Sequence, residues 1–235
     1  MQSTSRSVKV TFVVAVVVTI AALGTAVALR MVRAERADDG SSTRSSTAVE
    51  NAAERCGELP CEVLTSVPVG STTVELLADP DGKHGRLRFR DDNGASLRKT
   101  ALGDLGVHVT QKSLSCADGP TKACVVRGTL EGGLVGEVFV SRGSGWAAVT
   151  RPYFSTAKMI ELVQVTDDAT PEVVLAQFPD CAAPSSGVCD ESWVEVEVFR
   201  LDGSSLGCGG PYSSITRIPG WPDIDLAEEP LRSCA

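Results

Sequence analysis

The sequence predicts an all-β, disulfide-stapled domain that is held outside the cytoplasm behind one N-terminal transmembrane helix. Three observations predict it: an apolar run at residues 10–29, eight cysteines that all follow this run, and short β-rich segments separated by glycine-containing turns from Thr72 onward. The expected divisions are a cytoplasmic N-terminus (1–9), a transmembrane signal anchor (10–29), a flexible Ser/Thr-rich tether (30–49) and an extracytoplasmic β domain (50–235).

The apolar run Val10–Leu29 has the length of a membrane helix. A helix rises about 1.5 Å per residue, so a run of this length spans about 30 Å, the thickness of the hydrocarbon core. Basic residues lie on both sides, with Arg6 and Lys9 before the run and Arg30 and Arg33 after it, so they do not orient it. All cysteines follow the run, which favours an oxidising exterior for the C-terminal part and a cytoplasmic N-terminus.

A cleaved signal peptide is the alternative to an anchor. Ala26-Val27-Ala28 fits the small-x-small pattern of a cleavage site, and cleavage near Ala28 would give a secreted protein. The run is longer than a typical signal core, and Arg30 would follow the cut closely. These two features favour the retained anchor, a single-pass protein of the cell membrane.

The charge of the chain limits its partners. The net charge is −8, and beyond Arg36 there are 17 basic and 29 acidic residues, a net charge of −12. An acidic domain repels the phosphates of nucleic acids. The predicted partners are therefore the membrane, through the N-terminal helix, and an envelope protein or glycan, but no nucleic acid.

The end of the tether carries a helix signal. Thr47 and Glu50 form a capping box, which predicts a short helix over residues 48–55 that ends before Gly57. A helix of this length is unstable alone, so we expect it to lean on the domain.

The cysteines occur in closely spaced couples that suggest local disulfides. Two couples flank turns that contain both Pro and Gly, and such turns bring their ends together. No C-x-x-C pattern occurs and only two histidines are present, which disfavours zinc. The predicted pairs are Cys56–Cys61, Cys116–Cys124, Cys181–Cys189 and Cys208–Cys234.

The body of the domain consists of short segments of high β propensity. Turn sequences such as Asp81-Gly82, Asn93-Gly94 and Asp202-Gly203 separate them. Residues 158–165 are ambiguous and form a further candidate strand. The predicted strands cover residues 72–78, 85–90, 106–111, 123–130, 136–141, 171–178 and 193–201.

A weak internal repeat links three of these segments. Residues 87–97, 136–146 and 196–206 each contain a strand, a Gly turn and the start of a return strand, with Phe89, Phe139 and Phe199 at equivalent positions. A period of this size suits four-stranded propeller blades. Three blades are too few to close a propeller, so blade-like repeats and a sandwich both remain open.

The segment Ile160–Gln177 resembles the D-x-x-x-P-E-V-V core of FG-GAP/VCBS-type propeller blades. In that family an acidic loop binds calcium, and here only Asp167, Asp168 and Glu172 match while the loop glycine is missing. We therefore predict no cofactor. The whole chain, in which Arg outnumbers Lys 16 to 6, resembles the uncharacterised single-span envelope proteins of high-GC Gram-positive bacteria. That resemblance implies a location and no activity.

Two sequence patterns are typical of serine hydrolases. Gly203–Gly207 matches G-x-S-x-G, but no histidine follows it, which favours a hairpin turn. Ser155 and Lys158 match S-x-x-K, the basis of an alternative hypothesis of an envelope serine hydrolase, although no S-D-N or K-T-G pattern follows. His84 and His108 are expected in a turn and a strand, without a nucleophile beside them.

The remaining candidates are aromatic residues of the second half of the chain. They would form a glycan or peptide platform if they shared an exposed face, and otherwise pack in the core. No catalytic or metal-binding residue is predicted, so the favoured function is non-catalytic: binding, or service as an accessory subunit, with the ligand unknown. These aromatic residues are Trp146, Tyr153, Trp193, Tyr212 and Trp221.

Overall fold

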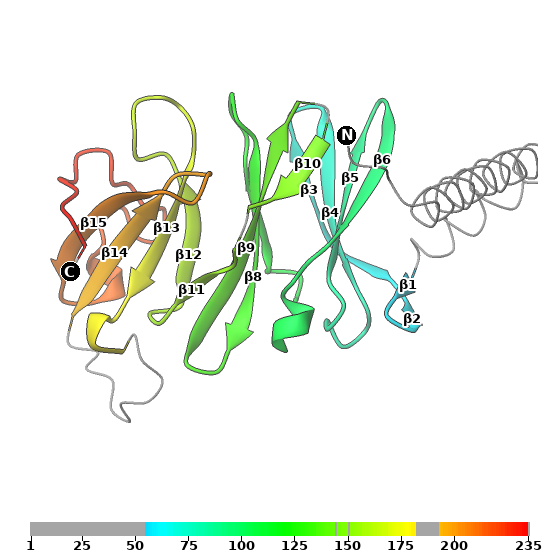
Figure 1. Cartoon of the computed structure of the whole chain (residues 1–235), viewed down its shortest axis with the longest axis horizontal. Helices are drawn as coiled ribbons and strands as arrows, with labels where there is room; N and C mark the ends of the chain where they lie inside the picture. Colours follow the sequence, from blue (N-terminus) through cyan, green and yellow to red (C-terminus); the bar gives the residue numbers. More distant parts are fainter. Residues whose placement is uncertain (1–54, 144, 150, 182–192, 235) are drawn as a thin grey trace, which may run out of the picture. The chain divides into compact units, whose positions relative to one another are not determined.

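The computed structural model describes residues 55–143, 145–149, 151–181 and 193–234, which form antiparallel β-sheets (Figure 1). The predicted cytoplasmic N-terminus, membrane helix and tether lie outside the described residues. Within the described part, no helix has the length and apolar character needed to cross a membrane. Most of the predicted helix over residues 48–55 also lies outside, but its last residue, Arg55, belongs to strand β1.

The first sheet is a four-stranded antiparallel meander. A two-stranded hairpin, β1 (Arg55–Cys56) with β2 (Leu59–Pro60), precedes it. In β5 the sequence alternates Arg and apolar residues, and Leu87 and Phe89 are buried while the arginines between them remain more exposed. Its strands are β3 (Glu62–Val69), β4 (Thr72–Ala78), β5 (Arg86–Asp91) and β6 (Gly94–Lys99).

The second sheet repeats this order and adds a fifth strand. Strand β11 (Tyr153–Ser155) pairs with β9 beyond the end of β10. The apolar residues in β8 and β9 do not alternate with polar ones, because both faces of this sheet are buried. The four main strands are β7 (Leu114–Ala117), β8 (Ala123–Leu130), β9 (Gly133–Arg142) and β10 (Gly145–Ala148).

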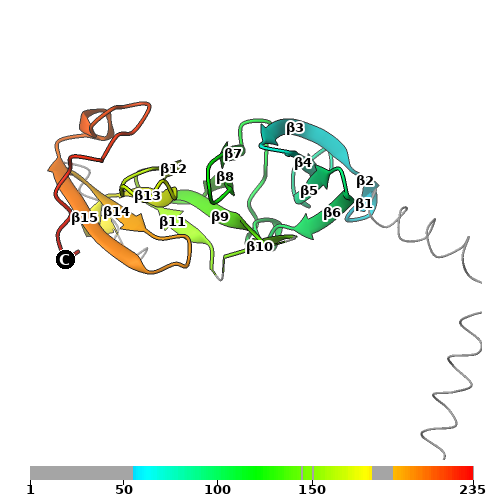
Figure 2. The same cartoon turned by 90° about the horizontal axis from the view of Figure 1, so that it is seen from above.

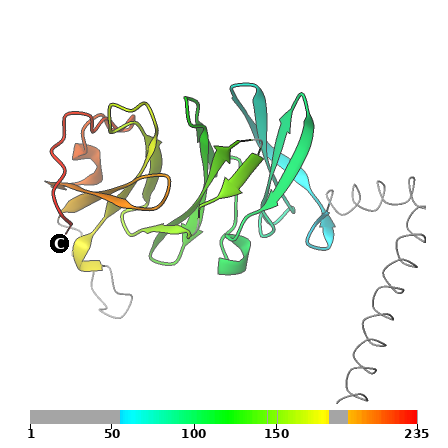
Figure 3. The ribbon, with the colours of Figure 1, turned by 45° about the horizontal axis from the view of Figure 1, so that its top comes forward.

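The third sheet is again a four-stranded meander, and the C-terminal tail packs on its far face. Figure 3 shows the tail beside this sheet. Ile218 and Leu226 of the tail are buried against Val174 and Val196. The strands are β12 (Met159–Val163), β13 (Glu172–Gln177), β14 (Val194–Phe199) and β15 (Ser205–Tyr212). Short 3-10 turns occur at η1 (Gly103–Leu105), η2 (Pro179–Cys181) and η3 (Ile215–Arg217).

Three hydrophobic cores alternate with the three sheets. Figure 2 shows the three sheets following one another. The first core lies between the first and second sheets and contains Leu76, Phe89 and Phe139. A second core lies between the second and third sheets, and a third core lies between the third sheet and the tail. The second and third sheets are thus buried on two faces, whereas the strands of the first sheet contribute to the first core alone.

The predicted repeat coincides with the strand order. Each copy spans the third strand of a sheet, the following turn and the start of the fourth strand. The side chains do not repeat in the same way, because Phe89 and Phe139 share the first core, with ring centroids 6.3 Å apart, and Phe199 lies in the second core. The first two sheets therefore point their equivalent phenylalanines toward each other.

Residues 106–111 were expected to form a strand, and this prediction is wrong. Val107 and Val109 are buried in the first core as the alternating pattern suggests. Their amides, however, donate to the carbonyls of Leu102 and Gly82 in loops rather than to a neighbouring strand. In this loop, buried and exposed residues alternate as they do in a strand. The ambiguous segment 158–165 does contain a strand, β12.

Three of the predicted disulfide pairs are present. Cys56 is bonded to Cys61, Cys116 to Cys124, and Cys208 to Cys234. Cys181 is also disulfide-bonded, and Cys189, its predicted partner, lies outside the described residues. The Cys208–Cys234 bond and a backbone bridge between Cys208 and Arg232 hold the tail against β15.

Candidate functional site

The candidate functional site is a groove of about 460 Å³ at one end of the first core. Four turns converge there: the β3–β4 and β5–β6 turns of the first sheet, and the β7–β8 and β9–β10 turns of the second. Its volume is within the range of small-molecule sites, roughly 300–1,000 Å³. The lining residues are Ser71, Thr72, Phe89, Asp91, Asn93, Gly94, Ala95, Ser96, Lys122, Ser141, Gly143, Gly145 and Trp146.

Two stacked aromatic rings form the floor of the groove. Phe89 in β5 and Trp146 in β10 have ring centroids 4.6 Å apart and nearly parallel planes. Each ring has a serine as its cross-strand partner, Ser96 for Phe89 and Ser141 for Trp146. The Arg98 side chain donates to the Trp146 carbonyl at 3.0 Å, which links the fourth strands of the two sheets. The floor is therefore fixed by both sheets.

Most polar side chains of the groove have no hydrogen-bond partner among the described residues. The hydroxyls of Ser71, Thr72, Ser96 and Ser141 make no hydrogen bond within the described part of the chain. The Trp146 indole N–H is also unpaired there. Among the described residues, the polar side-chain atoms that are both enclosed and unpaired are the Tyr153 and Tyr212 hydroxyls. The unpaired indole N–H of Trp146 is therefore not enclosed, and it reaches the solvent of the groove. Unpaired groups that converge on a hollow are available to a ligand.

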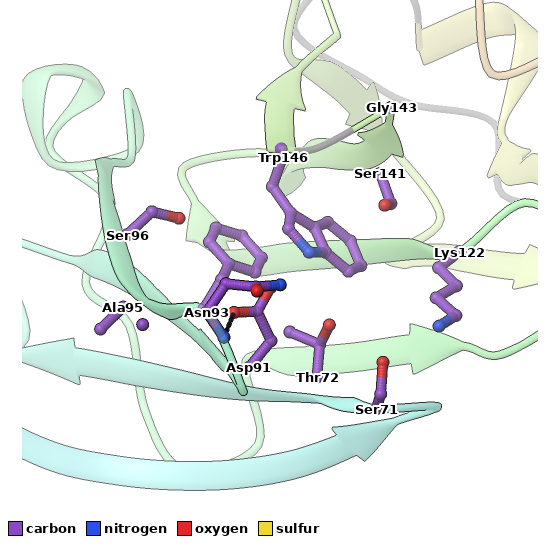
Figure 4. A pocket seen from close by; sticks show the side chains of 13 residues that line it. Ser71, Thr72, Asp91, Asn93, Ala95, Ser96, Lys122, Ser141, Gly143 and Trp146 are labelled. Carbon is purple, nitrogen blue, oxygen red and sulfur yellow. Dashed lines mark hydrogen bonds between the residues drawn. The ribbon is translucent and has the colours of Figure 1, made fainter.

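Opposite charges flank the aromatic floor. Figure 4 shows the Trp146 ring between Asp91 and Asn93 on one side and Lys122 on the other. One Asp91 oxygen accepts a hydrogen bond from the Asn93 backbone N–H at 2.8 Å, which fixes the turn. The second Asp91 oxygen remains available. No ion pair joins Lys122 to a carboxylate of the described residues.

Gly70 makes room for the Lys122 ammonium. It has a φ of 56°, in the left-handed region that favours glycine, and its amide donates to Asp118 at 3.0 Å. A β-carbon at position 70 would lie 2.3 Å from Lys122 Nζ. The absence of a side chain at Gly70 therefore allows Lys122 to occupy this position.

A second, smaller cleft of about 230 Å³ lies where β11 meets the third sheet, and its polar groups are largely paired. The Thr156 hydroxyl donates to Gln177 and accepts the Phe178 amide, and Gln177 donates to the Phe154 carbonyl. The lining residues are Phe154, Thr156, Gln177, Phe178, Pro179, Glu195, Glu197 and Cys234.

The two glutamates of this second cleft differ in their surroundings. Glu195 is buried, and it accepts a hydrogen bond from Arg232 at 2.8 Å. Burial raises the pKa of Glu197, and the neighbouring Glu195 raises it further. Glu195 and Glu197 are two residues apart in β14, so both side chains lie on the same face of the strand, toward the cleft.

The S-x-x-K pair is not assembled as a catalytic pair. The Ser155 side chain is fully buried, and its hydroxyl donates to the Ala176 carbonyl and accepts the Met159 amide. Lys158 is exposed in the turn before β12. The hydroxyl of Ser155 thus joins β11 to β13. The Gly203–Gly207 pattern lies at the β14–β15 turn, as expected, where Asp202 accepts hydrogen bonds from Ser204.

The acidic loop of the FG-GAP-like segment is closed by its own hydrogen bonds. Glu172 is buried and accepts the amides of Val165 and Thr166. Asp168 accepts the Thr170 amide, which lowers the pKa of Asp168. In the part of the chain that is described, no three His, Cys, Asp or Glu side chains gather as ligands of a metal would.

The histidines and aromatic residues complete the set that the sequence singled out. His84 hydrogen-bonds to buried Asp79 at 2.7 Å, and His108 to the Asp81 carbonyl, so both lie in loops. Of the aromatic residues, Trp146 and Tyr153 are buried, Trp193 and Tyr212 are half-buried, and Trp221 is 40% exposed. Of these five residues, Trp146 alone lines the groove, where it stacks on Phe89.

Comparisons of this chain with protein-family models, with curated proteins and with solved structures find no match.

Proposed function

We propose that this chain is a membrane-tethered domain outside the cytoplasm that acts by binding, and that the groove between the first two sheets is its ligand site. The observation that carries the proposal is the set of unpaired hydroxyls, indole N–H and charged groups around an aromatic floor. Such a lining suits a hydroxyl-rich ligand, a glycan rather than an apolar molecule. A role as an accessory subunit would use the same surface to bind an envelope protein.

The predicted anchor and the blade-like interpretation belong to this proposal. The disulfide bonds support an oxidising compartment. The four-stranded up-and-down order of each sheet supports blade-like repeats, with the tail packed on the last one.

Blocking the groove tests the site. Full-length protein in detergent is immobilised and exposed to oligosaccharides and to solubilised envelope extract. We expect Ser71→Trp, which fills the groove, to abolish capture of the ligands that the wild type retains. Ser66→Trp is the matched control, because Ser66 is exposed on β3 outside the groove. Equal capture by wild type and Ser71→Trp would show that the groove is not the site.

Thiol labelling tests the location. A membrane-impermeant maleimide should label intact cells only after reduction, since the cysteines are expected outside and oxidised. Labelling that appears only after lysis, without need of a reductant, would place the domain in the cytoplasm and contradict the proposal.

A further inference from the structure

We infer that the ligand of the groove is a sugar acid, a pyranose that carries a carboxylate, with Lys122 as the residue that recognises its charge. This inference rests on the proposed function and adds the charge of the ligand to it.

Lys122 makes no ion pair within the described part of the chain. Lys83 pairs with Asp81 and Lys99 with Asp104, whereas Lys112 and Lys158 are unpaired there but exposed. Lys122 is half-buried beside the β7–β8 turn and has no such partner among the described residues. Asp118 lies near Lys122 without forming an ion pair with it, and directs one oxygen to the Gly70 amide. A half-buried ammonium without a carboxylate is a ready partner for an anionic ligand.

The opposite wall offers the groups that hold sugar hydroxyls. The free oxygen of Asp91 can accept a hydrogen bond from a hydroxyl, and the Asn93 side chain can donate and accept hydrogen bonds. Hydroxyls of Thr72 and Ser141 and the indole N–H of Trp146 lie between the two walls (Figure 4). A ligand with a carboxylate at one end and hydroxyls around a ring matches both walls at once.

The charge of the wall opposite Lys122 disfavours dianions. Asp91 would repel a second negative charge, so a dianion such as free phosphate would contact one favourable and one unfavourable group. A ring that separates its single carboxylate from its hydroxyls avoids this conflict. The groove therefore selects an anion by where its charge lies as well as by its sign.

Isothermal titration of the full-length protein in detergent with glucuronic acid, a short oligomer of the same uronate, and glucose tests the inference. An exposed charge pair contributes about 1 kcal/mol, which corresponds to roughly fivefold in affinity. We expect glucuronate to bind about fivefold more tightly than glucose, and Lys122→Gln to abolish this difference. Tighter binding of the oligomer would identify a glycan chain as the source of the acid.

The control variant is Lys112→Gln, which removes an exposed lysine outside the groove and should keep the preference for glucuronate. Equal binding of glucuronate and glucose, or a preference that survives Lys122→Gln, would overturn the sugar-acid inference and leave the groove as a glycan site. Absence of binding by all three probes would also overturn it. In that case the Ser71→Trp capture experiment still decides separately whether the groove binds a ligand.

Discussion

The groove of the first two sheets and the cleft beside β11 are lined by similar residue types but use them differently. Each contains an aromatic ring, hydroxyl or amide side chains, and acidic groups. In the cleft, Thr156 and Gln177 bond to each other and to the backbone, and Glu195 bonds to Arg232. In the groove, the hydroxyls and Lys122 have no partner among the described residues. Composition alone therefore does not separate a site from a structural network, whereas hydrogen bonding does.

The difference follows from what each hollow has to hold together. At the cleft, the short strand β11 pairs with β9, and side-chain bonds from Thr156 and Gln177 connect its end to the third sheet. At the groove, the strands of two four-stranded meanders already fix the turns, and Arg98 links their edges. The hydroxyls of the groove are thus not needed for the fold.

Loss of Arg232 should have the largest effect on stability. Arg232→Met leaves the buried Glu195 carboxylate without its charged partner, and we expect a loss of roughly 1.5–3 kcal/mol in the free energy of unfolding. Urea unfolding followed by tryptophan fluorescence measures it. Arg142→Met, which removes an exposed arginine, should change stability by less than about 0.5 kcal/mol.

A second substitution separates the carboxylate from other effects of Arg232→Met. Adding Glu195→Gln to Arg232→Met removes the unpaired charge and should recover part of the lost stability. If Arg232→Met and Arg142→Met unfold at the same urea concentration, the cleft network does not stabilise the fold, and the comparison fails.

The same substitution in the two hollows gives the most direct comparison. Thr156→Val removes a hydroxyl that donates to Gln177 and accepts the Phe178 backbone amide, which would leave a partly buried N–H unpaired. We expect it to cost about 1–3 kcal/mol. Thr72→Val in the groove removes a hydroxyl without a protein partner and should cost less than about 0.5 kcal/mol. Thermal unfolding of both variants decides, and equal losses would contradict the assignment of the groove as a site.

Strand positions and disulfides were the most predictable features of the sequence. Residues 72–78 and 123–130 match β4 and β8, because β-branched and apolar residues with Gly turns leave few alternatives. Two predicted pairs, Cys56–Cys61 and Cys116–Cys124, follow from local geometry because short cysteine spacings flank hairpins. The third, Cys208–Cys234, spans 26 residues and joins the tail to β15. Strand β3 was missed, since Pro68 and the polar residues of Glu62–Val69 conceal it.

The groove could not be predicted, because it depends on contacts between distant turns. Phe89 was recognised as part of a repeat, and Asn93-Gly94 as a turn, but nothing local shows that Trp146 stacks on Phe89. Whether a serine is paired also depends on the fold. Ser155 belongs to the S-x-x-K motif, but its hydroxyl joins two strands. Ser71 and Ser141 belong to no catalytic motif, yet they line the groove.

The pH dependence of the cleft should be the smallest of these effects. Burial raises the pKa of Glu197 above the ordinary value of 4.5, so the folded protein holds this proton to higher pH than the unfolded chain does. The stability that this group contributes is fully present below the unfolded pKa and is lost as the pH rises through the folded pKa. Glu197→Gln removes that dependence. We therefore expect wild type to lose stability relative to Glu197→Gln as the pH is raised through this range, in urea unfolding at several pH values. A difference between the two proteins that does not change with pH would show that Glu197 is solvated like a surface carboxylate, and that the cleft is as open as the groove.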